Sequence, residues 1–236
     1  MRRHIAFLHT SSVHVETFER LAKAIDPALD VEHVVAEDLL VEAQRVGADD
    51  PALIARVHSA MADAAARGAA LVVCTCSTIG AAAERTPTGA GFAATRIDRA
   101  MADRAVALGP RVLLVGALGS TLAPTAALIR TSAAAARTRV ELQPLLVAGA
   151  WSHFLRGDRA AYVAAVALAV RAAASGADVV VLAQASMAPA AELLSDLGVE
   201  VLASPKLGVQ AAVPYLQGRA LARAPTEFGG QPFFGG

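Results

Sequence analysis

The stretch Leu71-Val-Val-Cys-Thr-Cys-Ser-Thr-Ile-Gly80 decides how the rest of the chain is interpreted. Its apolar run predicts a buried strand, and the polar residues that follow predict a loop that leads into a helix. The same pattern recurs without a gap at Val179-Val-Val-Leu-Ala-Gln-Ala-Ser186, 108 residues further along. Cys76 of the first copy falls opposite Gln184 of the second, so the two copies differ at a chemically important position.

The same offset recurs elsewhere in the chain. Asp50 and Gly68 bracket one helical pattern, and Asp158 and Gly176 bracket a second of equal length. An Asp before a helix and a Gly just after it are typical of helix ends. Three further pairs share the offset: Arg3 with Arg111, Ser12 with Ser120, and Thr17 with Thr125. We interpret the chain as the duplication of a unit of ~100 residues.

The duplication predicts two α/β halves at residues 1–106 and 107–221, followed by a glycine-rich tail at 222–236. Apolar strands alternate with helical stretches, which is typical of parallel sheets covered on both faces. We expect the halves to be related by a pseudo-twofold axis, with a cleft between them. Ligands of such sheets bind beyond the carboxyl ends of the strands. The predicted loops there are residues 9–12, 74–78, 96–98, 116–121 and 184–186.

The hydrophobic pattern gives a coarse secondary structure. Expected strands cover residues 4–8, 31–35, 70–73, 92–95, 112–115, 140–142, 179–182 and 199–202. Expected helices cover residues 13–25, 51–67, 122–137, 159–174, 187–197 and 206–221. Residues 36–49 form a charged connection, either a short helix or a lid, and residues 144–157 form an apolar loop. We expect these two segments to shape the pocket.

The composition of the chain argues against nucleic-acid binding and against a membrane-spanning helix. Lys and Arg number 21 and Asp and Glu also number 21, so a neutral chain without a basic cluster is not expected to bind nucleic acid. Hydrophobic residues make up 55%, but no stretch approaches the ~18 uninterrupted apolar residues of a membrane helix. The charged start is too short for a signal peptide, so we expect a cytoplasmic protein.

Cys74 and Cys76 are the only cysteines, and they lie two positions apart on one extended segment. They are therefore poorly placed to bridge each other, and reducing conditions in the cytoplasm keep thiols free. A Cys-x-Cys metal site needs further ligands, which no second Cys pair or spaced His pair supplies. We expect neither a disulfide nor a bound metal.

Cys76 is the candidate catalytic residue. It is followed by Ser77 and Thr78 at an expected helix start, where free backbone N–H groups favour an anion such as a carboxylate and lower the pKa of a thiol. A thiolate beside a carboxylate can exchange a proton at the adjacent carbon. The alternative is that Cys76 is a small buried hydrophobe. We expect Cys74 to continue the strand into the core.

The duplicated halves, with Val72-Val-Cys-Thr-Cys-Ser-Thr78 in one and Val179-Val-Val-Leu-Ala-Gln-Ala-Ser-Met187 in the other, resemble the aspartate/glutamate/hydantoin racemase superfamily. That group includes arylmalonate decarboxylase and maleate isomerase. The resemblance implies a cofactor-independent racemase or isomerase that acts next to the carboxylate of a small acid, with one cysteine from each half. Here Gln184 replaces the second cysteine, and an amide does not exchange protons as a thiol does. A single-cysteine decarboxylase of a malonate-type acid is therefore the alternative.

The resemblance also implies a set of carboxylate-binding hydroxyls. These are Ser77 and Thr78, helped by Ser120, Thr121 and Ser186 from the second half, with Ser12 as a weaker candidate. Gln184 would orient a polar group of the substrate. The competing explanation for each hydroxyl is plain helix capping.

Charged and histidine side chains near the expected cleft remain open to two interpretations. Arg96 and Asp98 either bind substrate or form a structural ion pair. His9 is either a general acid or a histidine bonded to backbone, and His153 is a lid candidate. The remaining histidines His14, His33 and His58 are expected on surfaces.

Two non-catalytic readings remain as rivals. Val115-Gly-Ala-Leu-Gly-Ser120 partly matches a dinucleotide-binding loop, with Glu141 roughly where a ribose-binding acid would sit, but its third glycine is absent. Duplicated α/β halves with a cleft also describe solute receptors. The oligomeric state is left open, and a homo-oligomer is compatible with the sequence.

Overall fold

The computed structural model describes residues 4–89 and 91–216. Two four-stranded sheets form the framework, and every neighbouring strand pair is parallel. The first sheet has the order β2 (Asp30–Val35), β1 (His4–His9), β3 (Leu71–Cys74), β4 (Ala93–Arg96). The second has the order β6 (Glu141–Leu146), β5 (Arg111–Gly116), β7 (Val179–Leu182), β8 (Glu200–Ala203). The predicted α/β class with two similar parallel halves is confirmed.

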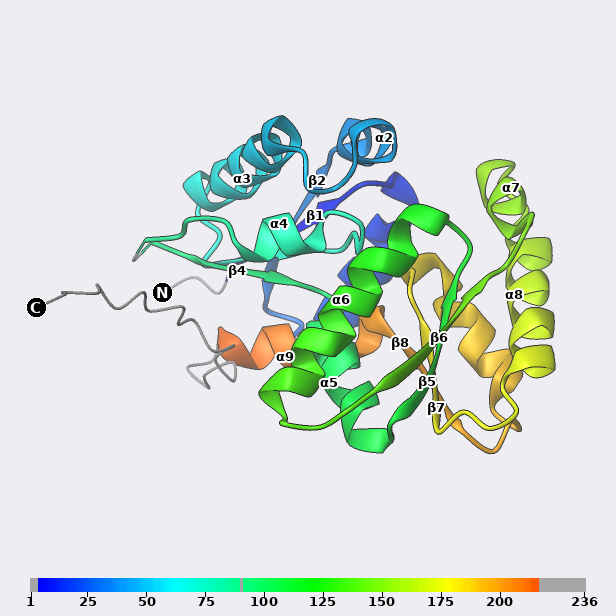
Figure 1. The fold of residues 1–236 in the computed structure, drawn as a ribbon. Coiled ribbons are helices and arrows are strands. Elements are labelled where there is room, and N and C mark those ends of the chain that lie inside the picture. Colours follow the sequence, from blue (N-terminus) through cyan, green and yellow to red (C-terminus); the bar gives the residue numbers. More distant parts are fainter. Residues whose placement is uncertain (1–3, 90, 217–236) are drawn as a thin grey trace, which may run out of the picture.

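Helices cover both sheets (Figure 1). In chain order they are α1 (Val15–Ile25), α2 (Glu37–Val46), α3 (Pro51–Ala66), α4 (Gly80–Glu84), α5 (Arg99–Leu108), α6 (Gly119–Ala135), α7 (Ala150–Leu155), α8 (Arg159–Ala173) and α9 (Ser204–Tyr215). Two 3₁₀ segments, η1 (Ser12–His14) and η2 (Ala185–Leu194), complete them.

The helix ends predicted at the two aspartates are confirmed. The Asp50 carboxylate accepts hydrogen bonds from the N–H groups of Ala52 and Leu53 at the start of α3. Asp158 caps α8 in the same way. Gly68 and Gly176 follow these helices with φ of 111° and 84°, a left-handed region that favours glycine.

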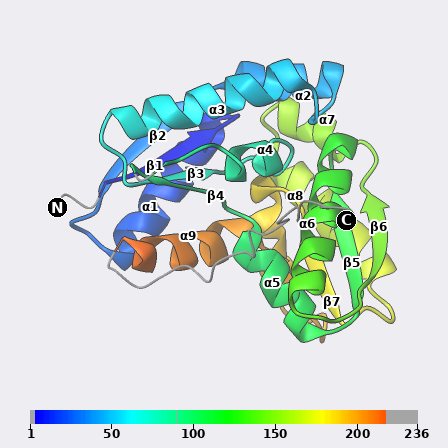
Figure 2. The same cartoon turned by 60° about the vertical axis from the view of Figure 1, so that its left-hand side comes forward.

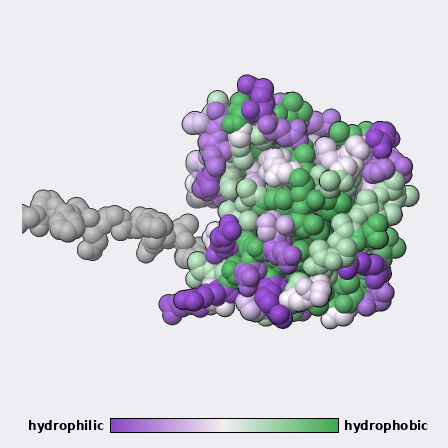
Figure 3. Space-filling view, turned by 45° about the vertical axis from the view of Figure 1, so that its right-hand side comes forward, coloured by the Kyte–Doolittle hydropathy of each residue, from purple (hydrophilic) through white to green (hydrophobic). Residues whose placement is uncertain are grey.

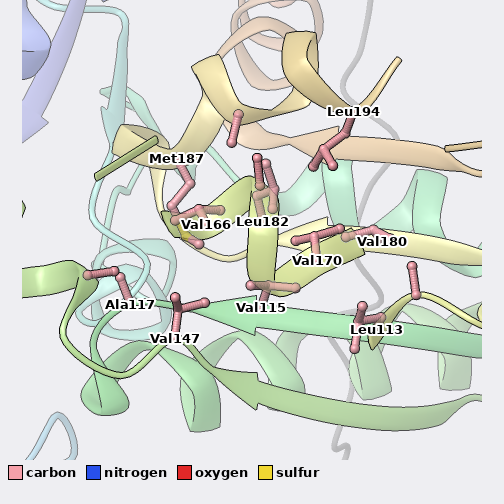
Figure 4. Packing of buried hydrophobic residues seen from close by; sticks show 14 of the residues in the cluster. Leu113, Val115, Ala117, Val147, Val166, Val170, Val180, Leu182, Met187 and Leu194 are labelled. Carbon is pink, nitrogen blue, oxygen red and sulfur yellow. The ribbon is translucent and has the colours of Figure 1, made fainter. Parts of the chain in front are cut away.

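The central strands are buried on both faces, which explains why their sequences are apolar without alternation. Every residue of β3 and β7 is buried. In the second half, Val180 and Leu182 of β7 pack against Val166 and Val170 of α8, with Met187 of η2 beside them (Figure 4). The core is built mainly from aliphatic side chains.

Helices α5 and α9 connect the two halves (Figures 1 and 2). Met101 of α5 belongs to the core cluster of the second sheet, whereas Val209 of α9 belongs to that of the first. The two helices also pack on each other, and a Cβ at Gly208 of α9 would lie 2.1 Å from the carbonyl oxygen of Ile97, two residues before α5. The division of the chain at residues 106 and 107 stays a prediction. Helix α5, most of which precedes this boundary, completes the core of the second sheet, and α9, which follows it, completes the core of the first.

Strand pairing corrects the single offset of 108. Leu71 pairs with Ile5 and Val179 pairs with Val112, so β3 and β7 are 108 residues apart but β1 and β5 are 107 apart. The second half therefore has one more residue between its first strand and its long helix. At the offset of these first strands the residue opposite Ser12 is Gly119, so the register of the strands does not support the expected match of Ser12 with Ser120.

Several element predictions were incomplete or wrong. Residues 144–157 are not a loop, since they contain the end of β6 and all of α7, and residues 36–49 contain α2. Helix α5 was not predicted. The helix expected at residues 187–197 is a 3₁₀ segment that contains Pro189, which has no N–H for an α-helical hydrogen bond. The end of the helix expected to reach residue 221 and the tail at 222–236 lie outside the described residues.

Among residues 4–89 and 91–216, no helix is long and apolar enough to cross a membrane. Figure 3 shows hydrophobic residues gathered on the side of α7 and α8, with hydrophilic residues above and below. Leu155 and Leu168 are exposed there. A cytoplasmic location and a homo-oligomeric state stay predictions.

Candidate active site

A cavity of about 50 Å³ lies where the carboxyl ends of the two sheets meet. Its first-half walls are Thr10, Ser11, His14, Leu40 and Thr75 to Thr78. Its second-half walls are Leu118, Thr121, Trp151, Phe154 and Gln184 to Ser186. The predicted loops at residues 9–12, 74–78, 116–121 and 184–186 therefore meet at one site.

The two cysteines have different environments, as expected. Cys74 is the last residue of β3 and is fully buried, and burial raises the pKa of its thiol. Its Sγ also contacts the carbonyl oxygen of Cys76 at 3.5 Å. Cys76 lies past the strand end, is half-buried and lines the cavity. Between the two, only Cys76 can meet a ligand in this cavity.

The expected helix start at Cys76 is wrong. Helix α4 begins at Gly80, has five residues, and has no side-chain cap. Ser77 and Thr78 form a turn before it, so the thiol lacks the helix terminus that was expected to activate it. The capping alternative for these two hydroxyls fails for the same reason.

Gln184 follows β7 as Cys76 follows β3, but its side chain is held by two backbone hydrogen bonds. Its Oε1 accepts hydrogen bonds from the N–H groups of Ala117 at 2.7 Å and Leu118 at 3.0 Å. An amide NH₂ cannot accept, so the oxygen faces these donors and the nitrogen is left to donate. This contact was missed because it joins segments that are 67 and 66 residues apart.

Thr10 and Ser11 occupy the corresponding positions after β1, at the offset of 107. No acceptor within residues 4–89 and 91–216 receives a hydrogen bond from the N–H group of either residue. Both line the cavity. The first half thus has two free backbone donors where the second half has two donors bound to Gln184.

A cross-half hydrogen bond and a buried ion pair hold the Cys76 loop. The Ser77 hydroxyl donates to the carbonyl oxygen of Ala183 at 2.8 Å. The Ser77 carbonyl in turn accepts from Arg96 Nη2 at 3.2 Å. Arg96 also makes a two-pronged ion pair with Asp98, with N–O distances of 2.6 and 2.9 Å. These contacts fix the loop from both sides.

Arg96 and Asp98 are buried and lie outside the cavity lining. Burial alone would raise the pKa of Asp98, but attraction and hydrogen bonds from Arg96 outweigh it and hold that pKa below its usual range. A Cβ at Gly80 would lie 2.8 Å from Arg96 Nε, so the glycine makes room for the guanidinium. We therefore assign the pair to positioning the loop and not to binding substrate.

The remaining predicted hydroxyls divide into two groups. Thr78, Thr121 and Ser186 line the cavity, and Ser186 Oγ is hydrogen bonded to the Tyr162 hydroxyl at 2.8 Å. Ser12 and Ser120 do not line it. Ser12 is exposed and bonded to Glu37 of α2. Its neighbours Thr10 and Ser11 line the cavity instead.

The histidines correct several expectations. His9 is fully buried, and its ring nitrogens bond to Thr75 Oγ1 and His33 Nδ1, so neither sequence alternative describes it. His14 lines the cavity, which its expected surface position did not foresee, whereas His33 and His58 are partly exposed. His153 does not line the cavity. Trp151 and Phe154 of the same segment line it instead, and their ring centroids are 4.6 Å apart.

The ring pKa values of two of these histidines are lowered. Burial lowers the pKa of His9 to about 3, and the nearby His33 and His14 rings add to the effect. Burial, together with the charge of Arg159, lowers the pKa of His14 to about 4. Both rings are therefore neutral near pH 7, and His14 can accept a proton from a ligand in the cavity.

A second, larger hollow of about 830 Å³ adjoins the first. The two share His14, Phe154, Ala185 and Ser186. The larger one lies between α1, α8, η2 and the start of α9, and its side chains are mixed in charge. It gives a ligand room to extend beyond the small cavity.

Structural details argue against a dinucleotide site at the Gly116 loop. The N–H groups of Ala117 and Leu118, which would face a pyrophosphate, are bound to Gln184. Glu141 is the first residue of β6 and so lies at the sheet edge opposite the ligand edge. Within the described ranges, no group of three or more His, Cys, Asp or Glu side chains could hold a metal ion.

The chain thus consists of two similar α/β halves, with a cavity that holds the Cys76 thiol where the ends of their sheets meet. The chain belongs to the Asp/Glu/Hydantoin racemase family, whose model matches residues 8–212. The resemblance seen in the Cys76 loop is thereby confirmed, and the protein is an enzyme of this family. No curated protein matches the chain in a search by sequence.

Solved structures share the fold. The chain is similar to the aspartate racemase of Picrophilus torridus, with 11% identity, a TM-score of 0.67, and coverage of 93% of this chain and 96% of that one. For allantoin racemase from Pseudomonas fluorescens, the identity is 18%, the TM-score 0.61, and the coverage 98% and 100%. For arylmalonate decarboxylase, the identity is 20%, the TM-score 0.59, and the coverage 92% and 94%.

Proposed function

We propose that the protein transfers a proton, without a cofactor, at the carbon next to a carboxylate of a small acid, with the Cys76 thiol as the acid and base. The observation that carries the proposal is the position of Cys76, which lines the cavity while Cys74 is enclosed in the core. A positioned thiol can act as a general acid or base. Membership of a racemase family supports this chemistry.

The free N–H groups of Thr10 and Ser11 would bind the substrate carboxylate. In the second half, the corresponding N–H groups hold the amide oxygen of Gln184. By analogy, the N–H groups of Thr10 and Ser11 suit a single oxygen that accepts a hydrogen bond from each of them. A carboxylate oxygen bound in this way would lie at the first-half end of the cavity, beside Cys76. The hydroxyls of Thr78 and Thr121 line the same cavity and would complete the site.

One-sided proton chemistry fits these residues best. Gln184 cannot exchange a proton at neutral pH, and its oxygen is already occupied. In a decarboxylation of a malonate-type acid, the bond to one carboxylate breaks and CO₂ leaves. The electron pair stays on the carbon, which takes the proton of the Cys76 thiol. The thiolate then regains a proton from solvent.

The apolar part of the cavity supports the loss of CO₂. Leu40 of α2 and Trp151 and Phe154 of α7 line it. A carboxylate among such side chains loses its hydration, which destabilises the charged ground state relative to the more dispersed charge of the transition state. Stereospecific decarboxylation is therefore the reaction that we favour.

Racemisation is the second candidate, and His14 is the observation that favours it. The His14 ring lines the cavity and is neutral near pH 7, so it can act as a second base in place of the missing cysteine. Cys76 and His14 would then act on the two faces of the carbon.

Incubation of candidate acids in D₂O separates these reactions. Decarboxylation gives CO₂ and a product with deuterium in one configuration, whereas racemisation washes deuterium into both enantiomers. Neither CO₂ nor exchange, across malonate-type acids and α-substituted acids that fit the cavity, would contradict the proposed function.

A further inference from the structure

A continuous chain of side-chain hydrogen bonds runs from the cavity wall to the surface. Thr75 Oγ1 lies 2.8 Å from His9 Nδ1, and His9 Nε2 lies 2.8 Å from His33 Nδ1. His33 Nε2 lies 3.1 Å from Glu19 Oε2. Thr75 lines the cavity directly before Cys76, and the Glu19 side chain is 42% exposed. The four residues come from the β3 loop, β1, β2 and α1.

The rings of this chain are held by their neighbours. The His9 and His33 rings stack with their centroids 5.1 Å apart, and the Phe7 ring stacks on His33 with a centroid distance of 5.8 Å. Phe18 packs against the His9 ring at 5.4 Å. Since His9 has no exposed surface, its ring cannot exchange protons with bulk water directly. Its exchange with solvent has to pass through a bonded neighbour, either Thr75 on the cavity side or His33 on the surface side.

The carboxylate at the outer end sets the direction of every hydrogen bond. An ionised Glu19 only accepts, so His33 donates from Nε2, and in a neutral His33 ring Nδ1 then accepts. His9 therefore carries its proton on Nε2 and accepts at Nδ1. The Thr75 hydroxyl must then donate to His9, although the carbonyl oxygen of Leu8 is also within 3.2 Å. The free lone pairs of Thr75 Oγ1 remain as acceptors.

We propose that Glu19, His33 and His9 are positioning residues that turn the Thr75 hydroxyl into a proton acceptor for the cavity and relay protons from the cavity to the surface. The second part rests on the proposed function of Cys76. In one passage, a water molecule in the cavity carries the thiol proton to Thr75 Oγ1, which passes its own proton to His9 Nδ1. His9 passes its Nε2 proton to His33 Nδ1, and His33 passes its Nε2 proton to Glu19. Glu19 releases the proton to solvent, and Cys76 is left as the thiolate, the form that removes the proton of the substrate carbon in racemisation.

The lowered pKa of His9, about 3, agrees with a neutral relay in which each ring changes only the nitrogen that bears the proton. A structural role alone would not require one direction along the chain. Direction is therefore the property to measure.

Nitrogen-15 NMR of the histidine rings tests the direction without any substrate. In the natural protein, His9 and His33 are expected as Nε2–H tautomers. Glu19→Lys places a donor where the carboxylate accepts, so His33 and His9 should both change to the Nδ1–H form. The matched control is Glu16→Lys, one turn earlier on α1. An unchanged His9 tautomer in Glu19→Lys, or an Nδ1–H form in the natural protein, would overturn the proposal.

Turnover tests the relay separately. His33→Phe keeps a ring against Phe7 but interrupts the chain, so kcat should fall by roughly 10-fold or more, less than the loss of the acid/base itself. His58→Gln is the control, since the His58 ring bonds to the carbonyl oxygen of Ala82 outside the chain. Unchanged kcat in His33→Phe would overturn the relay and leave the role of Cys76 intact. Full activity of Cys76→Ala with the expected tautomers would instead contradict the proposed function and leave the orientation of Thr75 intact.

Discussion

The hydroxyl of Ser77 donates a 2.8 Å hydrogen bond to the carbonyl oxygen of Ala183, across 106 residues of sequence. Ser77 directly follows Cys76, and Ala183 directly precedes Gln184. One bond thus fixes the two loops that differ between the duplicated halves. The cavity depends on this bond because its walls come from both loops.

We expect Ser77→Ala to destabilise the protein by about 1–3 kcal/mol, because the Ala183 carbonyl loses its partner in a buried place. Turnover should also fall, since the Cys76 loop loses its tie to β7. Urea unfolding and kcat measure the two effects. Thr131→Ala is the control, because it removes an exposed hydroxyl that bonds within α6. Equal stability of the two variants would refute this account of the loop.

Arg96→Met should be more damaging than the double change Arg96→Met/Asp98→Leu. The single change leaves the buried Asp98 without its partner, which costs about 3–5 kcal/mol, whereas the double change removes both charges. Urea unfolding at pH 7 measures the difference. A double variant no more stable than the single one would show that the unpaired charge is not the cause.

The same ion pair predicts an acid-sensitive stability. Because the pKa of Asp98 is lower in the folded protein than in the unfolded chain, its stabilisation is fully present above the unfolded pKa of ~3.9 and is lost as the pH falls through the folded value. The double variant lacks this group, so its stability should depend less on pH below ~4.

Gln184→Cys and Gln184→Ala separate the structural role of the glutamine from the effect of a second thiol. Both changes remove the acceptor of the Ala117 and Leu118 N–H groups, so both should cost about 1–3 kcal/mol. Only Gln184→Cys places a second thiol at the cavity. It alone should raise the exchange of deuterium into both enantiomers, as chiral chromatography with mass spectrometry would show. The same exchange in both variants would count against the pairing of this position with Cys76.

His14 should make stability depend on pH in mildly acidic solution. Its pKa is lowered to about 4 in the folded protein, so the unfolded chain binds a proton that the folded protein does not. The resulting stabilisation is fully present above the unfolded pKa of ~6.5 and is lost as the pH falls through the folded value. His14→Gln should flatten the fall in stability between pH ~6.5 and 4. Identical profiles of the natural protein, His14→Gln and the control His58→Gln would disprove this role of the ring.

The sequence predicted the framework well where single segments carry the signal. The apolar run at Leu71–Cys74 and the capping residues Asp50 and Asp158 depend on local chemistry, and the structure confirms them. Helix α5 was missed because Arg99–Leu108 mixes alanines with charged residues, although Asp98 and Gly109 flank it. Helix α7 was missed because six residues are too few to show a period.

The site was predicted only where a local sequence pattern carries the signal. Cys76, Thr78 and Gln184 follow strand ends, and parallel strands bring such ends together. The burial of Arg96 and the role of His14 depend on how distant segments pack, which no local pattern reveals. The one-residue difference between the first strands of the two halves shows only in the strand pairing.

The central claim is that the Cys76 thiol performs the proton transfer, and turnover of two matched variants tests it most directly. Cys76→Ala and Cys74→Ala each remove one sulfur, from positions two residues apart. On the acid that the natural protein turns over, we expect Cys76→Ala to lose about 10²-fold or more in kcat, and Cys74→Ala to keep most of its activity at some cost in stability. Comparable activity in both variants would contradict the account.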